Sequence, residues 1–211
     1  MDEPINITFM RHGRSRADDE NVFEGRYDSP LTEAGRAQAR ARGEGLKAGQ
    51  VHYDLIVAST LQRAHETARI IGEILEVPVE TDPDWMEFNN GPLAGVPIEE
   101  GKRRFPRPTF RNPYEAFWET GESEWELYSR AARAVAKVIR RGPGRYLVVG
   151  HGGILNQALR TIVGAQPPIN SAGTWFRFED LGYVHTVYYP GLHQWFFLEF
   201  QPGYFYEGTD R

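Results

Sequence analysis

Short apolar runs alternate with amphipathic helical segments along most of this chain, and this alternation restricts the fold more than any other feature. Residues 5–10 (INITFM), 53–60 (YDLIVAST) and 145–150 (RYLVVG) are apolar and contain β-branched side chains, as buried strands do. Helical patterns follow each of them. Strands that alternate with helices predict an α/β fold, a three-layer sandwich with a mostly parallel sheet and helices on both faces.

The predicted helices carry start and stop signals. Thr32 is an expected N-cap for the helix of SPLTEAGRAQARARGEGL, and Glu33 suits the positive end of its dipole. Ser123 and Glu126 have the spacing of a capping box, and Gly164 ends the helix of GILNQALRTIVG. Two apolar stripes are Leu61, Ala64, Ala68, Ile71 and Leu75, and Leu127, Ala131, Ala134, Val135 and Val138.

The C-terminal part of the chain has a different pattern. Residues 183–189 (YVHTVYY) and 193–200 (HQWFFLEF) alternate aromatic and polar side chains, with Pro190 and Gly191 between them. This pattern predicts a terminal hairpin. Its many aromatic side chains could contribute to a homodimer interface.

Residues 82–122 are the least regular stretch and hold six of the 14 prolines. We interpret residues 1–211 as a single domain with an insertion, or cap, at about 88–122. Within ten residues the insertion carries five positive charges: Lys102, Arg103, Arg104, Arg107 and Arg111. One interpretation is a cap over 98–118 that binds the part of an anionic substrate beyond its reacting group. The alternative is a solvated arginine face.

Composition excludes several classes of protein. The net charge of −5 and the pI of about 5.7 provide no basic field for nucleic acid or an anionic membrane. No apolar run approaches the roughly 20 residues that span a bilayer. The chain has no cysteine, so thiolate chemistry, disulfides and cysteine metal sites are excluded. The acidic N-terminus is unlike a secretory signal, and we expect a cytoplasmic protein.

Charged and imidazole side chains follow several predicted strands. His12 and His151 each come directly after a strand, where ligands bind in open α/β sheets. Arg11 precedes His12, Arg63 lies in the first turn of a helix, and Glu87 follows the next short segment. Together they predict an anion site with a nucleophile and an acid, in which a neutral imidazole is the available nucleophile for phosphorus. Two buried structural histidines, or a zinc pair that lacks a third ligand, remain alternatives.

Five segments in order, RHGRS, DSPLTEAGRAQA, ASTLQRAHETA, EFNNGPLAG and VVGHGG, resemble the histidine phosphatase superfamily, the phosphoglycerate-mutase-like proteins. The resemblance runs from about residue 5 to 175. It implies that His12 attacks the phosphoryl group, that Arg11, Arg63 and His151 bind its equatorial oxygens, and that Glu87 is the acid and base. It implies no metal and no cofactor.

Further substrate contacts are predicted from the resemblance and from the charged insertion. These residues are Gly13, Ser15, Asp18, Glu24, Gly25, Arg103, Arg104, Gly152 and Asn170. Two of them depart from the family pattern. Asp18 stands where the family usually has Asn, and Glu24 stands where it often has Ser, Thr or Gln. The loop beside the predicted phosphate site is therefore unusually acidic.

The resemblance implies a phosphomonoester hydrolase that acts through phosphohistidine on a small phosphorylated metabolite. A phosphoglycerate-mutase-type phosphoryl transferase is the alternative, since the KRRFPRP segment is similar to a twin-arginine segment that holds the substrate carboxylate in mutases. An inactive phosphate-binding module is a third hypothesis. It would be expected to lack the nucleophile or an arginine, and the chain lacks neither.

Overall fold

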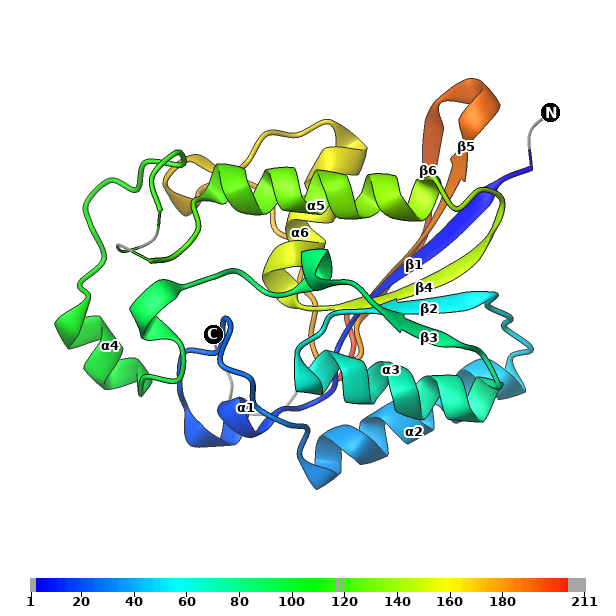
Figure 1. The fold of residues 1–211 in the computed structure, drawn as a ribbon, viewed down its shortest axis with the longest axis horizontal. Coiled ribbons are helices and arrows are strands. Elements are labelled where there is room, and N and C mark those ends of the chain that lie inside the picture. The colour runs from blue at the N-terminus through cyan, green and yellow to red at the C-terminus, as the bar shows by residue number, and fades with distance from the viewer. Residues whose placement is uncertain (1–2, 117, 119, 205–211) are drawn as a thin grey trace.

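The computed structural model describes residues 3–116, 118 and 120–204, and in this part of the chain a six-stranded sheet forms the centre (Figure 1). Its strands are β1 (Ile5–Arg11), β2 (Leu55–Ala58), β3 (Val79–Thr81), β4 (Gly144–Gly150), β5 (Tyr183–Tyr189) and β6 (Gln194–Gln201). They lie in the order β3-β2-β4-β1-β5-β6, with β1 to β4 mutually parallel and β5 and β6 antiparallel. The predicted mostly parallel sheet and terminal hairpin are confirmed.

Helices cover both faces of the sheet. The α-helices are α1 (Arg16–Glu20), α2 (Glu33–Ala48), α3 (Gln62–Leu75), α4 (Ile98–Arg104), α5 (Glu124–Ile139) and α6 (Gly152–Val163). Short 3-10 turns are η1 (Pro83–Trp85), η2 (Gly91–Leu93), η3 (Ile169–Ser171) and η4 (Pro190–Leu192). In Figure 1, α5 and α6 lie on one face, and α2 and α3 lie on the other.

The predicted helix caps are confirmed. The Thr32 hydroxyl accepts a hydrogen bond from the Gly35 amide at 3.0 Å. Ser123 and Glu126 exchange the two hydrogen bonds of a capping box, and Gly164 ends α6 with a φ of 70°. The short helix α1 is not among the helices predicted above. A capping box between Ser15 and Asp18 supplies its start.

Alternate side chains of the strands divide between two apolar cores. Leu55 and Val57 of β2 pack on the α5 and α6 side, whereas Ile56 and Ala58 pack against α3. Burying one such side chain contributes about 1.5–3 kcal/mol, whereas an exposed ion pair contributes about 0–1 kcal/mol. The two cores, rather than the surface charges, therefore hold the strands in register.

The register of β1 and β4 positions the site. Arg11 lies opposite Gly150 in this parallel pair, so the residues that follow, His12 and His151, leave adjacent strands at the same edge. The backbone N–H of His12 donates to the Gly150 carbonyl at 3.0 Å and extends the pairing by one residue. Two histidines that are 139 positions apart in the sequence are thus fixed side by side.

The irregular segment between β3 and α5 holds η1, η2 and α4 and projects beyond the carboxyl ends of the strands (Figure 1), and its role as a cap stays a prediction. On β6, the side chains of Phe196, Leu198 and Phe200 are exposed. The homodimer interface stays a prediction, and Phe205 and Tyr206 of the aromatic tail lie outside the described residues.

Candidate active site

His12 and His151 form the floor of the site. Their ring centroids are 5.0 Å apart, and the residues are 1% and 0% exposed. Burial, together with Arg11 and Arg63, lowers the pKa of His12 well below its usual value. Burial and Arg63 lower the pKa of His151 in the same way. Both imidazoles are therefore neutral near pH 7.

The contacts of His12 identify its tautomer. Nδ1 lies 2.7 Å from the carbonyl oxygen of Gly13, which can only accept a hydrogen bond. Nε2 lies 3.2 Å from Nε of Arg63, which can only donate. Nδ1 therefore carries the hydrogen and Nε2 carries the lone pair, which is the form an imidazole nucleophile needs.

Arg63 is fully buried and connects the nucleophile to the loop before α2. Its Nη1 donates to the Tyr27 carbonyl at 2.8 Å, and its Nη2 donates to the Gly25 carbonyl at 2.9 Å. Only Nε faces His12. The planar guanidinium group can make these three contacts at once, whereas the ammonium group of a lysine cannot.

Gly13 lets the backbone after the nucleophile approach the start of α2. A Cβ atom at this position would lie 2.8 Å from the Gly35 carbonyl oxygen. The Gly13 amide donates to the hydroxyl of Thr67 at 3.1 Å, and that hydroxyl donates to the Arg63 carbonyl at 2.7 Å. Steric room and hydrogen bonds together fix the position of this turn.

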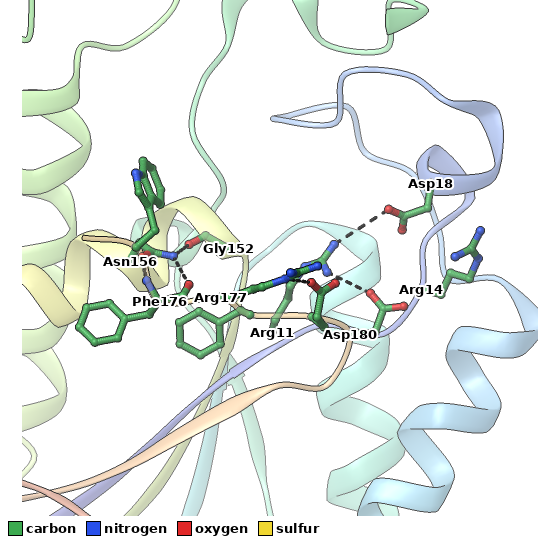
Figure 2. Close-up of a pocket in the computed structure, with 11 residues that line it drawn as sticks. Arg11, Arg14, Asp18, Gly152, Asn156, Phe176, Arg177 and Asp180 are labelled. Atoms are coloured by element: carbon green, nitrogen blue, oxygen red, sulfur yellow. Dashed lines mark hydrogen bonds and ion pairs between the residues drawn. The ribbon is translucent and has the colours of Figure 1, made fainter. Parts of the chain in front are cut away.

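Arg11 lies between two carboxylates (Figure 2). Its Nη1 donates to Asp180 at 3.0 Å, and its Nη2 lies 4.0 Å from Asp18. Burial raises the pKa of Asp180 to about 6, although Arg11 acts in the opposite direction. The sequence analysis missed Asp180, which lies 169 positions from Arg11 in a segment without a motif.

Glu87 is held at the N-terminus of α6. Its carboxylate accepts hydrogen bonds from the amides of Gly153 at 2.9 Å, Ile154 at 3.1 Å and Phe88 at 2.7 Å. His151 is the N-cap residue of the same helix. The proposed acid and the second histidine are therefore positioned by a single turn of backbone.

A buried ion pair that the sequence analysis missed supports the segment before Glu87. Arg130 of α5 pairs with Glu122 at 2.5 Å and donates to the carbonyl groups of Asp84, Met86 and Glu87. An arginine within a helix, 43 residues away, gave no signal in the sequence. The five hydrogen bonds of its guanidinium explain how an irregular segment can hold an acid in place.

His151 contacts a further residue at a strand end. Its Nε2 lies 2.8 Å from the hydroxyl of Ser59, which directly follows β2. Its buried Nδ1 has no hydrogen-bond partner within residues 3–116, 118 and 120–204. Ser59, another residue that the sequence analysis missed, orients this imidazole.

Two cavities open beside this cluster. One, of about 820 Å³, is lined by Arg11, Arg14, Asp18, Gly152, Asn156, Trp175, Phe176, Arg177, Phe178, Glu179 and Asp180 (Figure 2). The other, of about 350 Å³, is lined by Phe23, Glu24, Gly25, Glu87, Phe88, Asn90, Leu93, Arg111, Glu124, Leu127, Gly153 and Trp175. Trp175 borders both.

Most of the predicted substrate contacts come together here. Ser15, Asp18, Glu24 and Gly25 lie on α1 and the loops around it, in the segment that follows His12, and Gly152 begins α6. Gly25 has a φ of 49°, and a Cβ atom there would overlap the side chain of Asn90, so the turn requires glycine.

Three predicted contacts lie elsewhere. Arg103 and Arg104 are exposed on α4 and line neither cavity, and Arg104 pairs with Glu100 at 2.8 Å. Asn170 adopts a left-handed conformation, and its side chain accepts a hydrogen bond from the Arg111 amide at 3.0 Å. It joins the cap to the loop before β5. Arg111 is the cap arginine that reaches the cavity beside Glu87.

The comparisons agree with this geometry. The family profile described as histidine phosphatase superfamily (branch 1) matches residues 7–188, and the chain belongs to this family. It is 34% identical over 166 residues to the uncharacterized phosphatase PhoE of Bacillus subtilis, covering 78% of this chain and 81% of that protein. It is 32% identical to a 2,3-bisphosphoglycerate-dependent phosphoglycerate mutase of Methylobacterium, covering 75% of this chain and 80% of the mutase.

Solved structures share the fold. YhfR of Bacillus stearothermophilus has a TM-score of 0.76 at 24% identity, over 92% of this chain and 95% of that one. A mycobacterial glucosyl-3-phosphoglycerate phosphatase in complex with VO3 has a TM-score of 0.76 at 22% identity, over 92% and 97% of the two chains. Both phosphatases and mutases are thus among the proteins that this chain resembles.

The described residues provide neither a cluster of three metal ligands nor a membrane-spanning helix. No three His, Asp or Glu side chains among them gather in a way that could hold a metal ion. The helices in this part of the chain are all too short or too polar to cross a membrane.

Proposed function

We propose that this protein hydrolyses phosphomonoesters of small metabolites by transferring the phosphoryl group to Nε2 of His12. The observation that carries the proposal is the hydrogen bond from Arg63 Nε to that nitrogen, which identifies Nε2 as the atom with the lone pair. The atom faces a guanidinium, next to Arg11 and His151. A phosphoryl group there meets donors for the charge that builds on its equatorial oxygens.

In the first step, Nε2 forms a bond to phosphorus and the bond from phosphorus to the ester oxygen breaks. Glu87 gives a proton to that oxygen, so the leaving group departs as an alcohol. In the second step, the oxygen of a water molecule attacks phosphorus, and Glu87 takes a proton from that water. The bond between nitrogen and phosphorus then breaks, inorganic phosphate is released, and His12 is regenerated.

The relatives and the cavities support this substrate class. The structural relatives include phosphatases whose names specify glucosyl-3-phosphoglycerate and phosphoserine. The cavity beside Glu87 has aromatic walls at Phe88 and Trp175 and one cationic side chain, Arg111. A small phosphorylated metabolite with a polar remainder fits this lining.

Mutase activity is the alternative, because phosphoglycerate mutases are among the relatives. The position of Arg103 and Arg104 on the exposed side of α4 supports hydrolysis, since this arginine pair does not reach the substrate cavities. A mutase would protect its phosphohistidine from water for minutes, whereas a phosphatase would lose it within seconds.

The test is to trap the intermediate. Brief reaction with a labelled phosphomonoester and alkaline quenching should leave acid-labile phosphate on His12. His12→Ala should lower kcat by at least about a thousandfold, because no other group can form the intermediate. A variant of the distant, half-buried His185, such as His185→Asn, should leave both results unchanged. Label on a residue other than His12 would contradict the mechanism.

A further inference from the structure

Glu24 places its carboxylate against the groups that are proposed to bind the phosphoryl oxygens. Its Oε1 lies 3.3 Å from Nε of Arg63, and its Oε2 lies 3.8 Å from Nε2 of His12. The same Oε1 accepts a hydrogen bond from the Ser15 hydroxyl. An acidic oxygen of the protein itself therefore lies beside the nucleophilic nitrogen.

The cationic groups of the site face further acids. Arg11 pairs with Asp180 at 3.0 Å and lies 4.0 Å from Asp18. Both Nη atoms of Arg63 donate to backbone carbonyl groups, and its Nε faces His12 and Glu24. Three carboxylic acids thus stand beside two guanidinium groups, and an incoming phosphate dianion meets like charge at close range.

Glu24 shares its hydroxyl donor with a second acid. The Ser15 hydroxyl has a single hydrogen, yet it lies within hydrogen-bond distance of both Asp18 and Glu24, so the two acids share one donor. The Arg63 Nε–H is directed at His12. The Glu24 side chain is 21% exposed, in contrast to the buried Arg63. Turning it toward solvent would leave the buried Arg63 guanidinium without this carboxylate, so the movement requires another anion to take its place.

We propose that the Glu24 carboxylate is an internal competitor of the phosphoryl group. It occupies the position of an anionic oxygen beside His12 and Arg63, gives way when a phosphomonoester binds, and returns as inorganic phosphate leaves. Because phosphate alone must displace it, the site binds free phosphate weakly. Esters whose remainder binds in the cavity beside Glu87 gain the additional binding energy that displacement of the Glu24 carboxylate requires. The inference rests on the proposed function, since it takes the anion to be a phosphoryl group.

The test is the dissociation constant of inorganic phosphate, measured by isothermal titration calorimetry on the whole protein. Glu24→Gln keeps the shape of the side chain and removes its charge, and we expect phosphate to bind at least about tenfold more tightly. Glu20→Gln is the matched control. Glu20 lies in the same acidic region and pairs with Arg16 rather than with the site, so its removal should change the dissociation constant less than twofold. Glu24→Asp, which withdraws the charge by one methylene, should give a smaller gain.

The proposal would be overturned if the affinity of Glu24→Gln for phosphate were within twofold of that of the wild type. The same gain in Glu20→Gln would also overturn it, because the effect would then be one of overall charge. A different result would be that Glu24→Gln turns over esters with poor leaving groups more slowly and binds phosphate no more tightly. That result would overturn the competitor role and assign Glu24 to proton transfer. The titration requires no turnover. Failure of the competitor role is therefore distinguishable from failure of the proposed function, which the trapping of phosphohistidine tests separately.

Discussion

Nε of Arg63 lies 3.2 Å from Nε2 of His12 and donates a hydrogen bond to it. The same guanidinium binds the carbonyl groups of Gly25 and Tyr27. The nucleophile and the loop that carries Glu24 are therefore positioned by one side chain. A change in that side chain should affect the chemistry and the loop together.

Arg63→Lys should lower kcat/KM for p-nitrophenyl phosphate by at least about a hundredfold. An ammonium group cannot bind His12 and two carbonyl groups in one plane, so charge stabilisation in the transition state is lost. Steady-state kinetics would measure the loss. The control is Arg69→Lys on the same helix, at an exposed residue that pairs with Glu73, which should keep wild-type activity. Activity of Arg63→Lys within a few fold of the wild type would show that the fork is dispensable.

Glu87→Gln should slow alkyl phosphates much more than p-nitrophenyl phosphate in the phosphorylation step. An alkoxide needs a proton to leave, whereas a nitrophenolate does not. Single-turnover experiments on both substrates would give the ratio. Glu80→Gln, at an exposed residue that pairs with Arg141, is the control and should change neither rate. Equal losses on the two esters would argue against Glu87 as the acid.

Arg111→Ala should raise the KM of a phosphomonoester that carries a carboxylate by about tenfold and change that of a neutral ester little. Arg111 lines the cavity beside Glu87 and lies 3.3 Å from the buried acid Glu124, so its loss leaves an unpaired carboxylate facing the substrate. The double variant Arg103→Ala, Arg104→Ala should leave both KM values unchanged. If only the double variant raised the KM of the carboxylate-bearing ester selectively, α4 would have to move onto the site.

His151→Asn should reduce the pH dependence of stability between pH 5 and 6. Burial lowers the pKa of His151 well below 6.5, so in this range the unfolded chain binds a proton that the folded protein does not, and stability falls as the pH falls. The variant should lose about 1.4 kcal/mol per pH unit of that slope, measured by urea unfolding. An unchanged slope would show that His151 is protonated in the folded protein.

Asp180→Asn should have the opposite effect. The pKa of Asp180 is raised from 3.8 to about 6, so the folded protein holds the extra proton between these values. The contribution of this extra proton to the stability of the fold is present at low pH and is lost as the pH rises through about 6. Removing the acid should therefore steepen the fall in stability on acidification from pH 6 to pH 5. A shallower fall, measured in the same urea series, would contradict the raised pKa.

The catalytic cluster could be predicted from the sequence because its members follow strands. His12 and His151 are placed by the ends of two buried runs, and the order of elements brings those ends to one edge. Asp180 and Arg130 could not be predicted in this way, and for Ser59, which does follow a strand, the contact with His151 could not be predicted. Their roles depend on contacts with segments 43 to 169 positions away, and no local pattern marks such contacts.

The exposed position of Arg103 and Arg104 has a local cause that the sequence does contain. Glu99 and Glu100 precede the basic run, and on helix α4 they pair with Lys102 and Arg104 at spacings of three and four residues. The charges are thus largely balanced within one exposed helix. These helical neighbours favour the solvated arginine face, and a role of Arg103 and Arg104 in substrate binding stays a prediction.

The strand order has a consequence for synthesis of the protein. In the sheet, β1 lies between β4 and β5, so this strand has no neighbouring strand until the ribosome has made the chain up to β4. Chain segments that wait for distant partners fold late and expose apolar surface meanwhile. The proposed nucleophile, His12, directly follows β1, and its surroundings are completed only when β4 enters between β1 and β2. The onset of phosphatase activity during translation would therefore report the closing of the sheet.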